Sequence, residues 1–172
     1  EISEWLMKQA SQGSDMLIGF DFSSSFAFAD QGAYFPTWPE SPTHITDLWA
    51  MVEQYSQSDP HLGGHGFLQH PEIHRHFRHG QGIVGDLFGT GGGRLRIVER
   101  FQRDTGLSAS VSNFNLVGAA QVGKASLSGM RVLHRVHPQI PLWPLDPLPE
   151  SGPCLVETYT SLAARAAGIP KG

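Results

Sequence analysis

Two carboxylates stand directly behind short apolar segments, where they could take part in metal chemistry. Asp21 closes the run MLIGFD and Glu157 closes the run PCLVE, and Asp146 in the segment WPLDP is a third candidate. A carboxylate in such a position is costly to bury unless it is paired, hydrogen-bonded or bound to a metal. Converging carboxylates suit Mg²⁺ or Mn²⁺, which can activate water and stabilise a phosphoryl transition state. The alternative is structural: Asp21 accepts backbone hydrogen bonds and Glu157 caps the following helix.

The segment GAAQVGK, residues 118–124, matches the G-x-x-x-x-G-K part of a phosphate-binding P-loop. The next residue should be Ser or Thr to hold Mg²⁺, but it is Ala125, and Ser126 comes one place late. One position turns a side chain by about 100° on a helix, so Ser126 is no clean substitute. The segment is more typical of a closely packed helix start, and a P-loop-like ATP site is the minor alternative. Lys124 could still contact a phosphate, because helix N-termini attract anions.

Histidines are concentrated in the least regular part of the sequence, residues 57–93, which is also rich in glycine. His70 and His74 have the i, i+4 spacing of zinc ligands on a helix. The Glu of an H-E-x-x-H motif is missing, however, because Pro71 follows His70. We therefore expect solvated surface histidines in an irregular insertion. The set comprises His61, His65, His70, His74, His76 and His79.

Apolar periodicity predicts the elements that would position these residues. The run 16–22 is typical of a strand buried on both faces of a parallel sheet. The segment 94–105 should be a helix that points Leu95, Val98 and Phe101 inward. Together the elements predict a single α/β domain with too few strands for a full sheet, as if upstream strands were missing. We expect helices before Gly13 and at 45–55, 94–105, 122–136 and 160–168, and strands at 16–22, 140–143 and 153–159.

Composition excludes several classes of protein. Of the 172 residues, 40% are apolar and 16% are charged, which argues against disorder and against a coiled coil. The net charge of −4 provides no general basic field for nucleic acid. No apolar run is long enough for a membrane helix, and the first ten residues do not resemble a signal peptide. The single cysteine, Cys154, is consistent with the reducing cytosol, so a cytoplasmic location is expected.

A resemblance to a known family is carried by four segments: LIGFDFSSSFA, GDLFGTGGGRLRIVE, SNFNLVGAAQVGKASLSGMRVLHRV and PLWPLDPLPESGPCLVETYTSLAARAAG. They resemble a bacterial family, seen mostly in alphaproteobacteria, that is similar to the predicted nucleases of the ribonuclease H-like fold. In those nucleases an apolar strand ending in Asp is followed much later by an apolar strand that reads V-E-x-Y. The matching positions are Asp21 and Val156-Glu157-Thr158-Tyr159. The resemblance covers most of the chain and is strongest over 113–168.

The resemblance implies a ribonuclease H-like mixed sheet flanked by helices, with an earlier strand and its own Asp before the first residue of this sequence. It also implies metal-dependent phosphodiester hydrolysis with Mg²⁺ or Mn²⁺. Asp21 and Glu157, which occupy the matching positions, would be catalytic metal ligands. Independently of the resemblance, we add Asp146 as a candidate third ligand and Lys124 and Asn115 as candidate substrate contacts. The substrate could be nucleic acid or a small phosphorylated ligand. The competing hypothesis is a non-catalytic module of the same fold that binds a nucleotide or another ligand.

Overall fold

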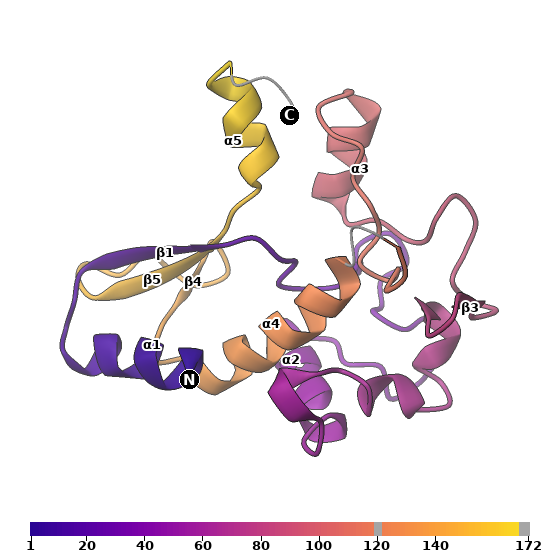
Figure 1. Ribbon diagram of the computed structural model, residues 1–172, viewed down its shortest axis with the longest axis horizontal. Helices are drawn as coiled ribbons and strands as arrows, with labels where there is room; N and C mark the ends of the chain where they lie inside the picture. Colours follow the sequence, from indigo (N-terminus) through magenta and orange to yellow (C-terminus); the bar gives the residue numbers. More distant parts are fainter. Residues whose placement is uncertain (119–121, 169–172) are drawn as a thin grey trace. The chain divides into compact units, whose positions relative to one another are not determined.

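The computed structural model describes residues 1–118 and 122–168 of the chain (Figure 1). The chain divides into two compact units. Unit 1 comprises Glu1–Phe22 and Val132–Gly172, and unit 2 comprises Ser23–Arg131. The class is mixed α/β, as the sequence predicts.

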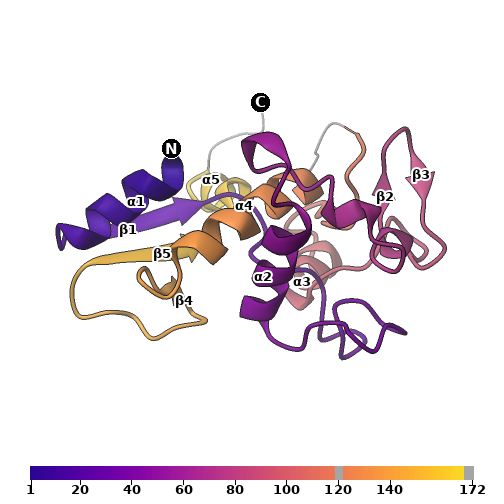
Figure 2. The same cartoon turned by 90° about the horizontal axis from the view of Figure 1, so that it is seen from below.

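Unit 1 contains a parallel sheet of three strands in the order β1-β5-β4. The central strand is β5 (Pro153–Glu157), which begins with three buried residues, as expected of a strand with neighbours on both sides. Its neighbours are β1 (Met16–Phe20) and the short β4 (Leu142–Trp143). The helix α1 (Ile2–Ser11) lies along this sheet in Figures 1 and 2, and α5 (Thr160–Ala166) follows β5.

Strand β1 is not buried on both faces, contrary to the prediction. Leu17 is 72% exposed and Gly19 is also exposed, whereas the alternate residues Met16, Ile18 and Phe20 are partly buried. Side chains of a strand alternate between the two faces of its sheet, so one face of β1 is largely uncovered. An uninterrupted apolar run does not show whether a second layer of structure covers each face of the strand. The prediction of burial on both faces was therefore wrong.

Unit 2 is organised around a cluster of aromatic rings. The ring centroids of Phe26 and Phe114 are 4.9 Å apart, and those of Phe26 and Phe77 are 5.2 Å apart. Phe35 and Phe67 extend the cluster, and all five side chains are almost completely buried. Its elements are α2 (Ile45–Tyr55), three 3₁₀ turns (Pro60–Leu62, Phe67–Gln69, His74–His76), the ribbon of β2 (Arg78–His79) and β3 (Ile83–Val84), α3 (Ile97–Asp104) and most of α4 (Val122–Val136).

The segment 57–93 is irregular, as predicted, but it supplies part of the core of unit 2. Phe67 and Ile73 are fully buried. Two glycines allow the chain to pack this closely: a Cβ on Gly66 would lie 2.1 Å from the carbonyl oxygen of Tyr55. A Cβ on Gly85 would likewise meet backbone of a neighbouring turn at 2.1 Å. The glycines therefore permit close backbone approach rather than marking a loose loop.

His76 overturns part of the histidine prediction. It is only 2% exposed, and its ring lies 5.5 Å from that of Phe35. Neither of its ring nitrogens has a hydrogen-bond partner in the described structure. Burial, together with the nearby charges of Arg94 and Arg75, lowers the pKa of His76 from 6.5 to about 4. His61 and His65 are exposed, as predicted.

Helix α3 faces opposite to the prediction for Val98 and Phe101, although Leu95, just before the helix, is buried as predicted. Val98 and Phe101 are 48% and 58% exposed, whereas the polar residues Glu99 and Gln102 are buried. Polar side chains on this helix have buried partners elsewhere in unit 2, and these partners decide which face turns inward. Among the described helices, none combines the length and the apolar character needed to cross a bilayer.

Candidate functional site

Asp21 and Glu157 lie at the same edge of the parallel sheet of unit 1. Phe20, the last residue of β1, pairs in register with Glu157, the last residue of β5. Asp21 follows immediately and is exposed, and Glu157 is partly buried. The carboxyl ends of adjacent parallel strands thus each carry an acidic residue, at the kind of edge where α/β sheets bind ligands.

The two carboxylates leave the sheet on opposite faces. A Cβ on Gly19 would lie 2.8 Å from the methyl group of Thr158, so Thr158 shares a face with Gly19. Because side chains alternate, Glu157 shares the other face with Phe20, and Asp21 returns to the face of Gly19. A cation shared by both carboxylates would therefore have to lie beyond the strand ends rather than over one face.

Thr160 orients the Asp21 carboxylate. Its hydroxyl donates a hydrogen bond of 2.9 Å to Oδ2 of Asp21. Thr160 is the first residue of α5, and the backbone before it is tied to β1 by the Thr158 N–H, which donates to the carbonyl of Phe20 at 2.8 Å. From the sequence Thr160 is only a candidate helix cap. The sequence carries no signal of this contact, because Thr160 and Asp21 are 139 residues apart.

The Asp146 carboxylate forms a hydrogen bond within the turn that follows β4. Its Oδ2 accepts a hydrogen bond of 2.8 Å from the backbone N–H of Leu142 and lies 3.2 Å from Nε2 of His137. Its own N–H donates to the carbonyl of Leu142, also at 2.8 Å. The side chain therefore turns back along β4. Within residues 1–118 and 122–168, no three His, Cys, Asp or Glu side chains are grouped so that they could hold a metal ion.

The two candidate substrate contacts belong to unit 2. Lys124 is exposed on the first turn of α4. Asn115 is partly buried, and its side-chain oxygen accepts a hydrogen bond of 3.1 Å from the N–H of Val117. Residues 119–121 of the P-loop-like segment lie outside the described residues, so the ATP-site alternative stays a prediction.

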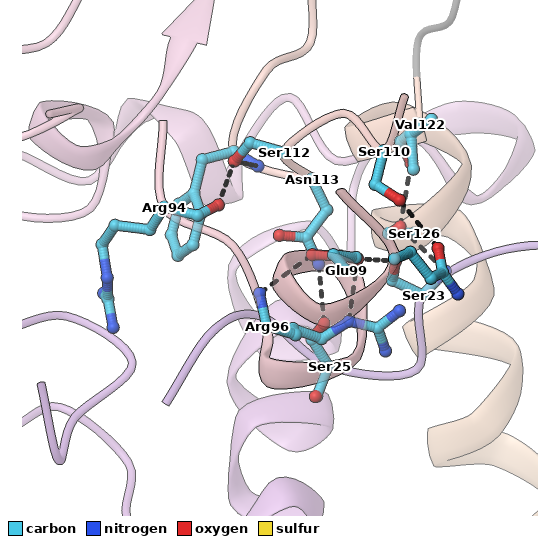
Figure 3. A network of polar contacts seen from close by, with 12 residues as sticks. Ser23, Ser25, Arg94, Arg96, Glu99, Ser110, Ser112, Asn113, Val122 and Ser126 are labelled. Atoms are coloured by element: carbon cyan, nitrogen blue, oxygen red, sulfur yellow. Dashed lines mark hydrogen bonds and ion pairs between the residues drawn. The ribbon is translucent and has the colours of Figure 1, made fainter. Parts of the chain in front are cut away.

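A buried polar network, which sequence reasoning missed, joins three segments of unit 2 (Figure 3). The backbone N–H of Ser23 donates to the hydroxyl of Ser126 on α4 at 3.2 Å, and the Ser23 hydroxyl donates to Glu99 on α3 at 3.4 Å. Glu99 also accepts hydrogen bonds of 2.9 Å from both the backbone N–H and Nε of Arg96. The network thus ties the segment after Phe22 to the two helices.

Most groups of this network are satisfied internally, so it acts as a scaffold. The side-chain amide of Asn113 donates to the carbonyl of Ser25 at 2.6 Å, and the Ser126 hydroxyl donates to the carbonyl of Val122 at 2.8 Å. Only the Asn113 side-chain oxygen, among the atoms of this network, is buried without a partner in the described structure. The run of three serines at 23–25, together with Glu99, was the available sequence signal.

The strand edge of unit 1 therefore offers two carboxylates and a hydroxyl that orients one of them. Comparison of the chain with protein-family models, with curated proteins and with solved structures finds no match. The carboxylates at the strand ends are the feature from which a function can be inferred, because Asp21 is exposed and only partly engaged in the structure around it.

Proposed function

We propose that this chain is a metal-dependent phosphodiester hydrolase of the ribonuclease H-like class, with Asp21 and Glu157 as ligands of Mg²⁺ or Mn²⁺. The observation that carries the proposal is the register of Phe20 with Glu157, which sets an acidic residue at the carboxyl end of each of two adjacent parallel strands. Ligands in open α/β sheets bind outside the carboxyl ends of the strands. Asp146 is not required, since its carboxylate already serves the turn after β4.

Two carboxylates fit the cation proposed. Mg²⁺ is usually held by one or two carboxylates, with waters and substrate phosphates completing its coordination, rather than by a cage of protein ligands. When bound, such an ion lowers the pKa of a coordinated water and stabilises negative charge on phosphoryl oxygens. The protein's own contribution is to hold the ligands: the backbone ladder fixes the spacing of the two strands, and Thr160 fixes the orientation of Asp21.

The substrate class follows from charge as well as from the ligands. The net charge of −4 disfavours tight, sequence-independent binding to a polyanion, whose affinity comes mainly from lysine and arginine. A short nucleic acid and a small phosphodiester are both compatible with this charge. The sequence-predicted phosphate contacts Lys124 and Asn115 belong to unit 2, so the proposal for the strand ends of unit 1 does not use them. The described sheet β1-β5-β4 is parallel throughout rather than mixed as expected, and it is compatible with a ribonuclease H-like sheet. The resemblance over 113–168 is what favours that class.

A non-catalytic ligand-binding module is the second candidate. The observation that favours it is the divergence of Asp21 and Glu157 to opposite faces, together with the engagement of Asp146 by Leu142 and His137. Such a module keeps the sheet without assembling a metal site. It predicts that divalent cations change neither the activity nor the thermal stability of the chain.

Hydrolysis of bis(4-nitrophenyl) phosphate and of a short single-stranded DNA separates these functions. Each substrate is tested with MnCl₂, MgCl₂ or EDTA. We expect metal-dependent turnover that falls by at least about 100-fold in Asp21→Asn and Glu157→Gln, as when a group that stabilises charge in the transition state is lost. Glu150→Gln, which removes an exposed carboxylate of unit 1 away from the strand ends, should retain activity. Absence of turnover with either metal, or undiminished turnover in Asp21→Asn, contradicts the hydrolase.

A further inference from the structure

Strand β1 has an edge that no strand pairs with among the described residues. In the parallel ladder, the carbonyl of Phe20 accepts the N–H of Thr158, so Phe20 and Ile18 direct their backbone groups toward β5. The backbone groups of the intervening residues, Leu17 and Gly19, therefore point away from β5. Each contributes one N–H and one C=O to the outer edge.

This edge lacks the features that usually protect an edge strand. Natural sheets discourage further pairing with lysine or proline on the edge strand, with a bulge, or with a covering segment. The sequence MLIGF contains no charge and no proline, and its ladder with β5 is continuous from Met16 to Phe20. Leu17 is 72% exposed and Gly19 is exposed. The outer edge is therefore open to pairing with an added strand.

The charges beside β1 indicate which added strand fits. Asp15 and Asp21 flank the strand, and both are exposed. If a second copy of this chain paired antiparallel with all five residues of β1, Asp15 of each copy would face Asp21 of the other. Like charges in this arrangement are destabilising. A segment with basic residues at both ends would instead be complementary to the two carboxylates.

We propose that the outer edge of β1 binds an extended segment of a partner protein, with a short uncharged β-forming centre and lysine or arginine at each end. Main-chain hydrogen bonds to Leu17 and Gly19 supply the affinity, as in other cases of strand addition. The flanking aspartates select the basic ends. This proposal concerns the chain without a divalent cation at Asp21, because a bound cation would cancel one of the two negative charges, and its test is therefore made in EDTA.

Amide hydrogen exchange of the whole chain tests the proposal, with Lys-Lys-Val-Thr-Val-Thr-Val-Lys-Lys as the probe peptide. Without peptide, the amides of Leu17 and Gly19 should exchange rapidly, while those of Ile18 and Phe20 are protected by β5. With peptide, we expect the exchange of Leu17 and Gly19 to slow by at least about tenfold, equivalent to about 1.4 kcal/mol. The peptide Glu-Glu-Val-Thr-Val-Thr-Val-Glu-Glu should give no such protection.

A matched pair of variants tests the location of binding. Leu17→Lys adds a positive charge at the edge and should abolish protection by the basic peptide, whereas Leu148→Lys, at a similarly exposed residue outside β1, should leave it intact. Four outcomes overturn the proposal: Leu17 and Gly19 already protected without peptide, equal protection by both peptides, undiminished protection in Leu17→Lys, or a dimer of the chain that Leu17→Lys dissociates. None of these outcomes depends on whether the chain hydrolyses phosphodiesters.

Discussion

The two units differ in what their charged side chains do. In unit 2 the guanidinium of Arg94 is buried and is matched by Asp30 and by several carbonyl oxygens, and Arg131 is buried against Glu53. In unit 1 the Asp21 carboxylate is exposed at the end of a strand and accepts a hydrogen bond from Thr160. The charges of Arg94 and Arg131 have a structural explanation, whereas Asp21 is placed where a ligand could reach it. We infer that the candidate site is indicated by a carboxylate exposed at the end of a strand, rather than by a buried charge.

The largest loss of stability is expected from removing Arg94. Its guanidinium donates to both oxygens of Asp30, at 2.6 and 2.9 Å, and to the carbonyl of Tyr34 at 2.6 Å. Arg94→Ala leaves these acceptors buried without a partner and should lower the free energy of unfolding by about 3–5 kcal/mol. Urea unfolding measures the loss. Arg100→Ala, at an exposed position of α3, is the control and should cost less than about 0.5 kcal/mol. Equal losses would contradict a structural role for Arg94.

Two phenylalanines test the inverted orientation of α3. Phe114 is fully buried in the aromatic cluster, whereas Phe101 is 58% exposed. Phe114→Ala should lower the free energy of unfolding by about 3–4 kcal/mol, because it opens a cavity in the core. Phe101→Ala should cost less than about 1 kcal/mol. Thermal unfolding of the two variants, followed by circular dichroism, makes the comparison, and a larger loss in Phe101→Ala would reverse the orientation described.

His76 should make unit 2 sensitive to acid. Burial lowers the pKa of His76 to about 4, below its ordinary value of 6.5, so the unfolded chain binds the proton more tightly than the folded chain. Its contribution to stability is therefore full above about pH 6.5 and is lost as the pH falls toward 4, by up to about 3 kcal/mol. His76→Phe cannot take up a proton at this position. Urea unfolding at pH 7, 6, 5 and 4 should show a shallower decline for this variant, and parallel curves would contradict the prediction.

The element pattern could be predicted where a local signal was strong. The helix at 45–55 and the strand beginning at Pro153 follow from helical spacing and from an apolar run, and the structure has both. The sides that face inward were harder to predict. Val98 and Phe101 point outward because Glu99 and Gln102 have buried partners outside the helix. Ser23, the partner of Glu99, is distant in the sequence, and Ser110, the partner of Gln102, lies in the loop after α3, so helical periodicity records neither contact.

The candidate site was predictable only in outline. Apolar runs that end in acidic residues indicate strand ends, but the register that pairs Phe20 with Glu157 depends on contacts between distant segments. The same is true of Asp146, whose turn after β4 is closed by its hydrogen bond with Leu142. The hydrogen bond from Thr160 to Asp21 could not be predicted from the sequence, since a hydroxyl at the start of a helix usually caps that helix.

A smaller effect, on metal affinity rather than on stability, is expected at Thr160. It tests whether the hydroxyl positions Asp21 for a ligand. Thr160→Val removes the hydroxyl that donates to Asp21 but keeps the shape of the side chain. We expect weaker Mn²⁺ binding by about 2- to 10-fold, equivalent to about 0.4–1.4 kcal/mol, because one hydrogen bond contributes about this much. Thr160→Ser retains the hydroxyl and should restore the affinity. If Thr160→Val and Thr160→Ser bind Mn²⁺ equally well, the hydroxyl does not position Asp21.

The most direct test of the strand-end site is titration of the chain with MnCl₂ by calorimetry, in wild type, Asp21→Asn, Glu157→Gln and the control Glu150→Gln. The site predicts a saturable metal-binding event in wild type and in Glu150→Gln that is lost in both Asp21→Asn and Glu157→Gln, since each removes one of the two carboxylates. Undiminished Mn²⁺ binding in either site variant, or no binding in wild type, would contradict the claim that Asp21 and Glu157 share a divalent cation.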